Sequence, residues 1–157
     1  MSYKLEYPYT EEEKMDFIVE YNHNQGLRIE EVETTLYALE ANELLVNGEV
    51  VIDPDYEAKQ EQARRERIAK LYLTGADVER GIYQAKGMDF EDIINFVSAN
   101  PPEGLNIKAL KIELKANNFY RGNPYVSAIG QLLGFTEEQL DKFFITNDYK
   151  ALLDEVE

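Results

Sequence analysis

The sequence predicts a mixed α+β protein that is mostly α, and three patterns carry this prediction. Helix caps of Thr or Asp recur along the chain, and one Asn-Gly dipeptide separates two short apolar runs that favour strands. The third pattern is a long run of alternating charges between these regions. Together they predict a small α+β module over residues 1–53, a charged connecting helix over 54–73, and a helical module of four to five short helices over 74–157.

The first element is a helix over residues 10–23. Glu13 follows Thr10 at the spacing of a capping box, in which each side chain accepts a hydrogen bond from the other residue's backbone. Apolar residues then recur at helical spacing up to Tyr21. The turn-forming residues 24–26, Asn-Gln-Gly, are expected to end this helix.

The clearest local signal is L-L-V-N-G-E-V-V-I, which predicts a hairpin of 43–46 with 49–52. A type I′ turn needs positive φ at both central residues, which Asn47 tolerates and Gly48 adopts freely. An isolated hairpin is marginally stable in water. We therefore expect either a strand within 33–39 as its third strand or the helix 10–23 packed on one face.

The remaining chain is predicted to be helical. A charged helix follows Asp53-Pro54-Asp55, and its residues become mostly apolar only near its end, over 68–73. Alternatively, this helix docks on a partner or forms a coiled coil. Later helices are expected from their caps and breakers, and residues 151–157 as a short helix or a frayed tail. Four of these helices are predicted to start at Thr74, Asp89, Pro124 and Thr136. A further helix, basic and amphipathic, is predicted over about 106–119.

Composition argues against several classes of function. The chain has no Cys and a single His, His23, so thiolate chemistry is absent and neither a metal site nor a Ser-His-Asp triad is expected. No phosphate-binding, nucleophile-elbow or calcium-loop motif occurs. We expect no catalytic residues, no cofactor and no enzymatic activity. Since no signal peptide and no run of about 18 apolar residues occurs, we expect a cytoplasmic protein without membrane contact.

The negative charge is concentrated near the N-terminus. Residues 1–50 hold 12 Asp and Glu against 3 Lys and Arg, out of a net charge of −15 for the whole chain. Direct binding of nucleic acid is disfavoured, because affinity for phosphate comes from Lys and Arg. The charge either keeps the protein soluble or imitates a phosphate surface that occupies a nucleic-acid-binding protein.

Two aromatic clusters are candidate contact surfaces, since Tyr and Arg bury area and still form hydrogen bonds. The first cluster holds Tyr3, Tyr7 and Tyr9, which either form an exposed arm or cover the sheet. The second cluster spans residues 117–125, around the turn between two predicted helices. Its side chains either contact a partner, or Arg121 and Asn123 cap and brace this turn while Phe119 lies in the core. The candidate residues are Tyr3, Tyr7 and Tyr9, and then Tyr120, Arg121, Asn123 and Tyr125.

The chain resembles the small accessory proteins encoded in the tail module of prophages from Gram-positive bacteria. The resemblance lies in L-L-V-N-G-E-V-V-I-D-P-D-Y, in E-R-I-A-K-L-Y-L-T, and in A-N-N-F-Y-R-G-N-P-Y followed by I-G-Q-L-L-G-F-T-E-E-Q-L-D-K-F-F, which together span about 43–144. It implies a tail or tail-fibre assembly role through a protein partner, in the bacterial host cytoplasm or associated with the virion. The alternative is an acidic inhibitor of a host nuclease or immune effector. The resemblance transfers no functional residue and implies no oligomeric state.

Overall fold

The chain divides into two compact units, Met1–Gln60 (unit 1) and Glu61–Glu157 (unit 2). The structure, a computed structural model, describes residues 3–154. The boundary between the units falls within helix α2 (Tyr56–Ala69), inside the stretch predicted as the connecting helix. Each unit buries its own cluster of apolar side chains.

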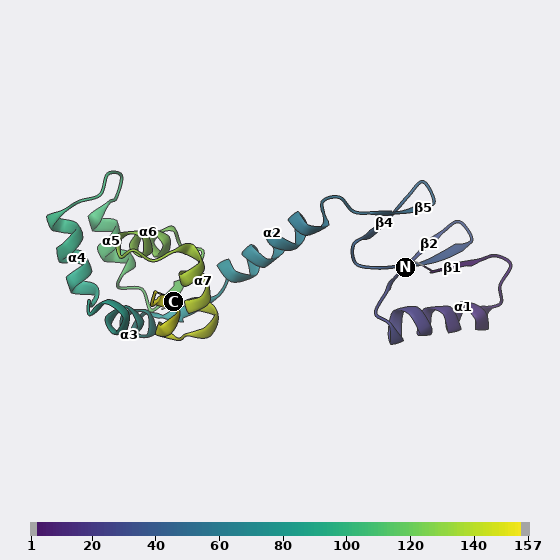
Figure 1. The fold of residues 1–157 in the computed structure, drawn as a ribbon, viewed down its shortest axis with the longest axis horizontal. Coiled ribbons are helices and arrows are strands. Elements are labelled where there is room, and N and C mark those ends of the chain that lie inside the picture. The colour runs from purple at the N-terminus through teal and green to yellow at the C-terminus, as the bar shows by residue number, and fades with distance from the viewer. Residues whose placement is uncertain (1–2, 155–157) are drawn as a thin grey trace. The chain divides into compact units, whose positions relative to one another are not determined.

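Unit 1 is built on a three-stranded antiparallel sheet with a helix on one face (Figure 1). The strand order is β1-β3-β2, so β3 is central. Phe17 from the helix packs with Leu36 and Ala38 of β3, which are almost fully buried. The elements are β1 (Tyr3–Glu6), α1 (Glu11–Ile18), the π-helix η1 (Val19–Asn24), β2 (Arg28–Val32) and β3 (Thr35–Leu39).

The predicted helix over 10–23 is confirmed in its start and approximate extent. Thr10 and Glu13 form the expected capping box, with the Glu13 amide donating to Thr10 Oγ1 at 3.1 Å. From Val19 onward the helix widens to π geometry and ends at Asn24. Nothing in the sequence pattern signals this change of geometry.

The hairpin forms at the predicted residues, as β4 (Glu43–Val46) and β5 (Glu49–Ile52). Asn47 and Gly48 have φ values of 53° and 79°, as the turn requires. Of the two alternatives for supporting the hairpin, pairing with the strand within 33–39 is wrong, and the helix over 10–23 packs on the three-stranded sheet rather than on the hairpin. That strand, β3, pairs instead with β2 through a tight turn at Glu33 and Thr34, and with the distant β1.

The hairpin is a separate two-stranded sheet that lies on the other face of the three-stranded sheet. Leu36 and Ala38 point toward α1, so Tyr37 and Leu39 point away from it. The Tyr37 hydroxyl donates to the Gly48 carbonyl at 3.4 Å, and Arg28 Nη2 donates to the Glu43 carbonyl at 2.8 Å. Leu39 is completely buried on this side, which completes a three-layer arrangement in unit 1.

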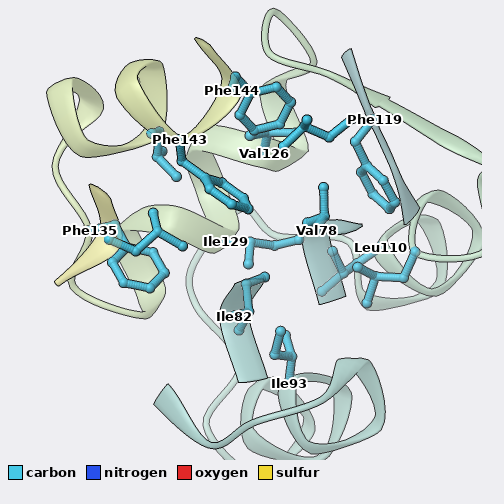
Figure 2. Packing of buried hydrophobic residues seen from close by; sticks show 14 of the residues in the cluster. Val78, Ile82, Ile93, Leu110, Phe119, Val126, Ile129, Phe135, Phe143 and Phe144 are labelled. Carbon is cyan, nitrogen blue, oxygen red and sulfur yellow. The ribbon is translucent and has the colours of Figure 1, made fainter. Parts of the chain in front are cut away.

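In the described part of unit 2, the five α-helices that follow α2 and a short β-ribbon pack around one apolar cluster (Figure 2). Ile93, Val97 and Leu110 are completely buried there. The elements are β6 (Tyr72–Thr74), α3 (Gly75–Lys86), α4 (Phe90–Ala99), α5 (Ile107–Glu113), β7 (Asn118–Tyr120), α6 (Pro124–Leu132), α7 (Glu137–Thr146) and the 3₁₀ turn η2 (Tyr149–Leu152). The predicted C-terminal helix or tail is confirmed only as this turn, and residues 155–157 lie outside the described residues.

The predicted helix starts in unit 2 are confirmed by their caps. Asp89 and Thr136 form complete capping boxes with Asp92 and Gln139, and Thr74 accepts from the Asp77 amide at 3.1 Å. Each of these bonds satisfies a backbone amide that has no partner within its own helix.

The C-terminal ends of two predicted helices are short strands instead. The helix over 54–73 begins at Tyr56 and ends at Ala69, and the helix over about 106–119 ends at Glu113. β6 and β7 pair antiparallel, with Leu73 opposite Phe119. The ladder continues beyond them, because the Arg121 amide donates to the Leu71 carbonyl at 2.9 Å. This long-range pairing overrides the local helical pattern.

Helix α7 fits against two glycines of neighbouring helices. A Cβ added at Gly81 of α3 would lie 2.4 Å from Phe143 Cζ, and one added at Gly130 of α6 would lie 2.5 Å from Leu140 Cδ1. Both distances are shorter than real Cβ contacts, so Phe143 and Leu140 would have to shift to admit a larger residue at either glycine. Within residues 3–154, no helix combines the length and the apolar character that crossing a bilayer requires.

Candidate functional site

The N-terminal tyrosines belong mostly to the sheet layer of unit 1. Tyr3 lies in β1 opposite Ala38 and stacks on Tyr21, with ring centroids 4.4 Å apart. Tyr9 packs against the apolar cluster of unit 1. Tyr7 contacts Tyr9 edge-on and remains 66% exposed, so it is the tyrosine of this group that solvent reaches best.

The second predicted cluster is split between surface and interior. Phe119 is buried in the core of unit 2, whereas Tyr120 is 51% exposed. Asn123 caps α6 by accepting from the Tyr125 amide at 3.0 Å and also donates to Glu113 Oε2 at 3.0 Å. Tyr125 is half-buried against the core.

Arg121 is a buried cation that joins three elements of unit 2. It follows β7, donates to Ser127 Oγ of α6 at 3.0 Å, and forms ion pairs with Glu137 and Asp141 of α7. The Nε to Asp141 Oδ1 distance is 2.7 Å. The hydrogen bond from Arg121 holds the pKa of the Glu137 carboxyl below its ordinary value. The guanidinium of Arg121 is therefore paired with two carboxylates and links α6 to α7.

A polar groove of about 280 Å³ lies beside Arg121. Its cationic walls are Arg64 and Arg65 of α2, and both point to the carboxylate of Glu61, with Arg65 Nε 3.0 Å from Glu61 Oε1. The charges that line the groove are thus balanced by neighbours on the same helix and on α7.

The ribbon presents a tyrosine pair that the sequence pattern had not indicated. Tyr72 of β6 lies opposite Tyr120 of β7, with ring centroids 5.6 Å apart, and Tyr72 is 56% exposed. The exposed-buried-exposed order of Y-L-T and N-F-Y is a strand signal, but each run has only three residues. We call Tyr72 and Tyr120 the tyrosine pair.

The outer face of the hairpin is a second exposed apolar surface. Cross-strand partners share a face, so Leu44 and Val51 lie on the same side as Val46 and Glu49. Leu45, on the opposite side, lines a groove together with Tyr37 of the sheet. We call Leu44, Val46 and Val51 the hairpin outer face; Val46 is 47% and Val51 38% exposed.

The interior of unit 2 offers little space for a ligand. An apolar cavity of about 30 Å³ is lined by Val78, Ile129 and Phe143, whose packing Figure 2 shows, and this is about the volume of one water molecule in the liquid. Among residues 3–154, no group of three or more His, Asp or Glu side chains could hold a metal ion. His23 lies at the exposed end of the π-helix.

Comparison with known proteins adds no family to these observations. No protein-family model, no curated protein and no solved structure matches this chain.

Proposed function

We propose that this chain is a noncatalytic interaction protein of a prophage tail module, which assists the assembly of a tail or tail-fibre component. One observation carries the proposal: each unit has its own core and presents its own exposed apolar surface. These surfaces are the hairpin outer face in unit 1 and the tyrosine pair in unit 2. Exposed apolar and aromatic clusters are typical of contact sites, and two of them suit an adaptor that meets two protein partners. The sequence resemblance supplies the tail context, with the host cytoplasm or the virion as the place of action.

The test is recovery of partners from an induced lysogen that carries a tagged copy of the chain. We expect tail or fibre proteins to copurify with the wild-type chain, in the lysate or in purified virions. Each double variant, Val46→Ser with Val51→Ser or Tyr72→Ser with Tyr120→Ser, should lose a subset of these proteins. Tyr83→Ser is the matched control, because Tyr83 is a single exposed tyrosine on α3, 61% exposed. Absence of tail proteins from every preparation would contradict the proposal.

The second candidate function is an acidic inhibitor that imitates nucleic acid. Unit 1 supports it with 15 Asp and Glu against 4 Lys and Arg in residues 1–60. The arrangement of these carboxylates favours it less, because they are divided between α1 on one side of the sheet and the hairpin on the other. Glu43 is buried, and Glu6, Glu30 and Glu31 are paired with Lys4, Arg28 and Lys14.

Competition with DNA or RNA for a host nuclease or immune effector discriminates between the two functions. An inhibitor of this kind should displace nucleic acid strongly at low salt and weakly at high salt, because the competition is electrostatic. No displacement at low salt would remove this second candidate.

A further inference from the structure

The hairpin is apolar on both faces, and the described part of unit 1 covers a part of only one of them. L-L-V and V-V-I are continuous apolar runs, a pattern typical of strands that are covered on both sides. Leu45 faces the three-stranded sheet, while Val46 and Val51 of the outer face remain exposed. A two-stranded ribbon with an uncovered apolar face has a surface suited to further packing.

The outer edge of β5 carries backbone groups that the hairpin does not use. In an antiparallel pair with a two-residue turn, the residues that flank the turn exchange hydrogen bonds, and so does every second pair after them. These are the pairs Val46 with Glu49 and Leu44 with Val51, and the Asp53 amide donates to the Asn42 carbonyl at 2.8 Å in the same series.

The amides and carbonyls of Val50 and Ile52 therefore point away from β4. Within residues 3–154 the hairpin sheet has only two strands, so no third strand lies along this edge. Ile52 is 62% exposed, which leaves the edge open to an added strand.

The charge around this edge specifies what could bind there. Residues 40–57 contain six Asp and Glu and no Lys, Arg or His, and exposed Glu49 and Asp55 lie at the two ends of β5. A second copy of the same hairpin would bring like charges together, which is unfavourable. A basic segment is the complementary occupant.

We propose that β5 and the hairpin outer face bind an extended, basic segment of a protein partner, which adds to the hairpin as a third strand. This proposal rests on the proposed function, since it assigns the site of one partner contact. The added strand would exchange backbone hydrogen bonds with Val50 and Ile52 and place apolar side chains on Val51. Its Lys or Arg residues would lie near Glu49 and Asp55.

The probe for this site is a capped heptapeptide with two lysines at each end and three valines between them, added to the full-length ¹⁵N-labelled chain. We expect the amide signals of Val50 and Ile52 to shift and their hydrogen exchange to slow, with no comparable change in β1 or β2. Two control peptides separate pairing from charge. One replaces every lysine by glutamate, and the other keeps the lysines but carries N-methyl groups on alternate residues, which block strand pairing.

Two substitutions at Ile52 form a matched pair for the same measurement. Ile52→Pro removes an amide that no partner within the hairpin uses, and proline is tolerated on such an edge. Ile52→Thr keeps the amide and also loses the apolar side chain. We expect Ile52→Pro to weaken peptide binding by about tenfold or more and Ile52→Thr by about threefold or less, because the backbone donor carries the pairing. The dispersion of the amide spectrum checks that both variants are folded.

Several outcomes would overturn the proposal. Equal binding of the N-methylated peptide would show charge attraction without pairing, and shifts confined to β1 or β2 would place the site elsewhere. Self-association in sedimentation that Val51→Asp abolishes would make a second copy the occupant. If the peptide does not bind while tail proteins still copurify with the chain, this inference fails and the proposed function stands. If the peptide binds but no tail protein copurifies, the proposed function fails and the edge site stands.

Discussion

The two units reach their folds by different means. Unit 2 buries side chains from helices α3 to α7 and from its ribbon in one cluster, whereas unit 1 holds a small cluster between α1 and the sheet. Unit 1 also carries 15 acidic against 4 basic residues, while unit 2 carries 16 against 12. A domain of about 60 residues is marginal even without such self-repulsion. Unit 1 therefore has less stability of its own to lose than unit 2.

The largest difference between the units should follow a large-to-small substitution in each core. Phe17→Ala truncates the buried side chain of α1 in unit 1, and Ile93→Ala makes a similar change in unit 2. Each should cost about 2–5 kcal/mol. Hydrogen exchange should show β3 unprotected in Phe17→Ala, while α4 of Ile93→Ala remains protected because unit 2 has more stability to lose. Equal loss of protection in both would contradict the difference between the units.

Removal of the Arg121 guanidinium should have the next largest effect. Arg121→Met leaves Glu137 and Asp141 without their cation and should lower the free energy of unfolding of unit 2 by about 3 kcal/mol. Arg65→Met is the matched control, since the exposed pair of Arg65 with Glu61 should contribute at most about 1 kcal/mol. Urea unfolding followed by fluorescence or circular dichroism measures both values.

A glycine substitution tests how tightly unit 2 is packed. Ala normally stabilises a helix relative to Gly, but Gly81→Ala should destabilise unit 2 by about 1–3 kcal/mol because the new methyl group overlaps Phe143. Shortening the partner in the double variant with Phe143→Leu should recover part of the loss. A stabilising effect of Gly81→Ala alone would show that α7 can move away at little cost.

The stability of unit 2 should depend on pH through Glu137. Its pKa is lowered in the folded state by the hydrogen bond from Arg121, so the folded state favours the ionised carboxylate. The resulting stability is fully present above the unfolded pKa of about 4.3 and is lost as the pH falls through the lower folded pKa. Glu137→Gln should therefore flatten the decline of unit 2 stability below about pH 4.3. Glu138→Gln controls for the loss of one negative charge from the same helix turn.

The smallest predicted effect lies in the β2–β3 turn of unit 1. Glu33 has a φ of 55°, which costs a non-glycine residue free energy. Glu33→Gly should stabilise unit 1 by about 0.5–1 kcal/mol. Thr34→Gly, at the neighbouring position without positive φ, should not stabilise it. The exchange rates of β3 amides report the difference.

The elements that could be predicted depend on neighbours in the sequence. The boxes at Thr10, Asp89 and Thr136 each need two residues three apart, and the hairpin needs only Asn47-Gly48 between apolar runs. A sequence pattern contains all the information that fixes such features. Their predicted positions are confirmed to within a residue or two.

The elements that could not be predicted depend on pairing across long separations. Tyr3 pairs with Ala38, and Tyr72 pairs with Tyr120, so each strand forms only because a distant segment supplies its partner. Runs of three or four residues carry too little periodicity to reveal this. The two carboxylates that pair with Arg121 could not be predicted either, because they lie 16 and 20 residues after it in the chain. Whether any tyrosine of either predicted cluster contacts a partner stays a prediction.

The glycine contacts of α7 have a consequence for synthesis of the chain. Phe143 and Leu140 fill the space over Gly81 and Gly130, and α7 leaves the ribosome after α3 and α6 have already emerged. Until then, the apolar side chains that α7 covers have no partner, and a nascent chain in that state is exposed to aggregation or chaperone capture. Translation that pauses just before residue 137 would prolong this vulnerable interval.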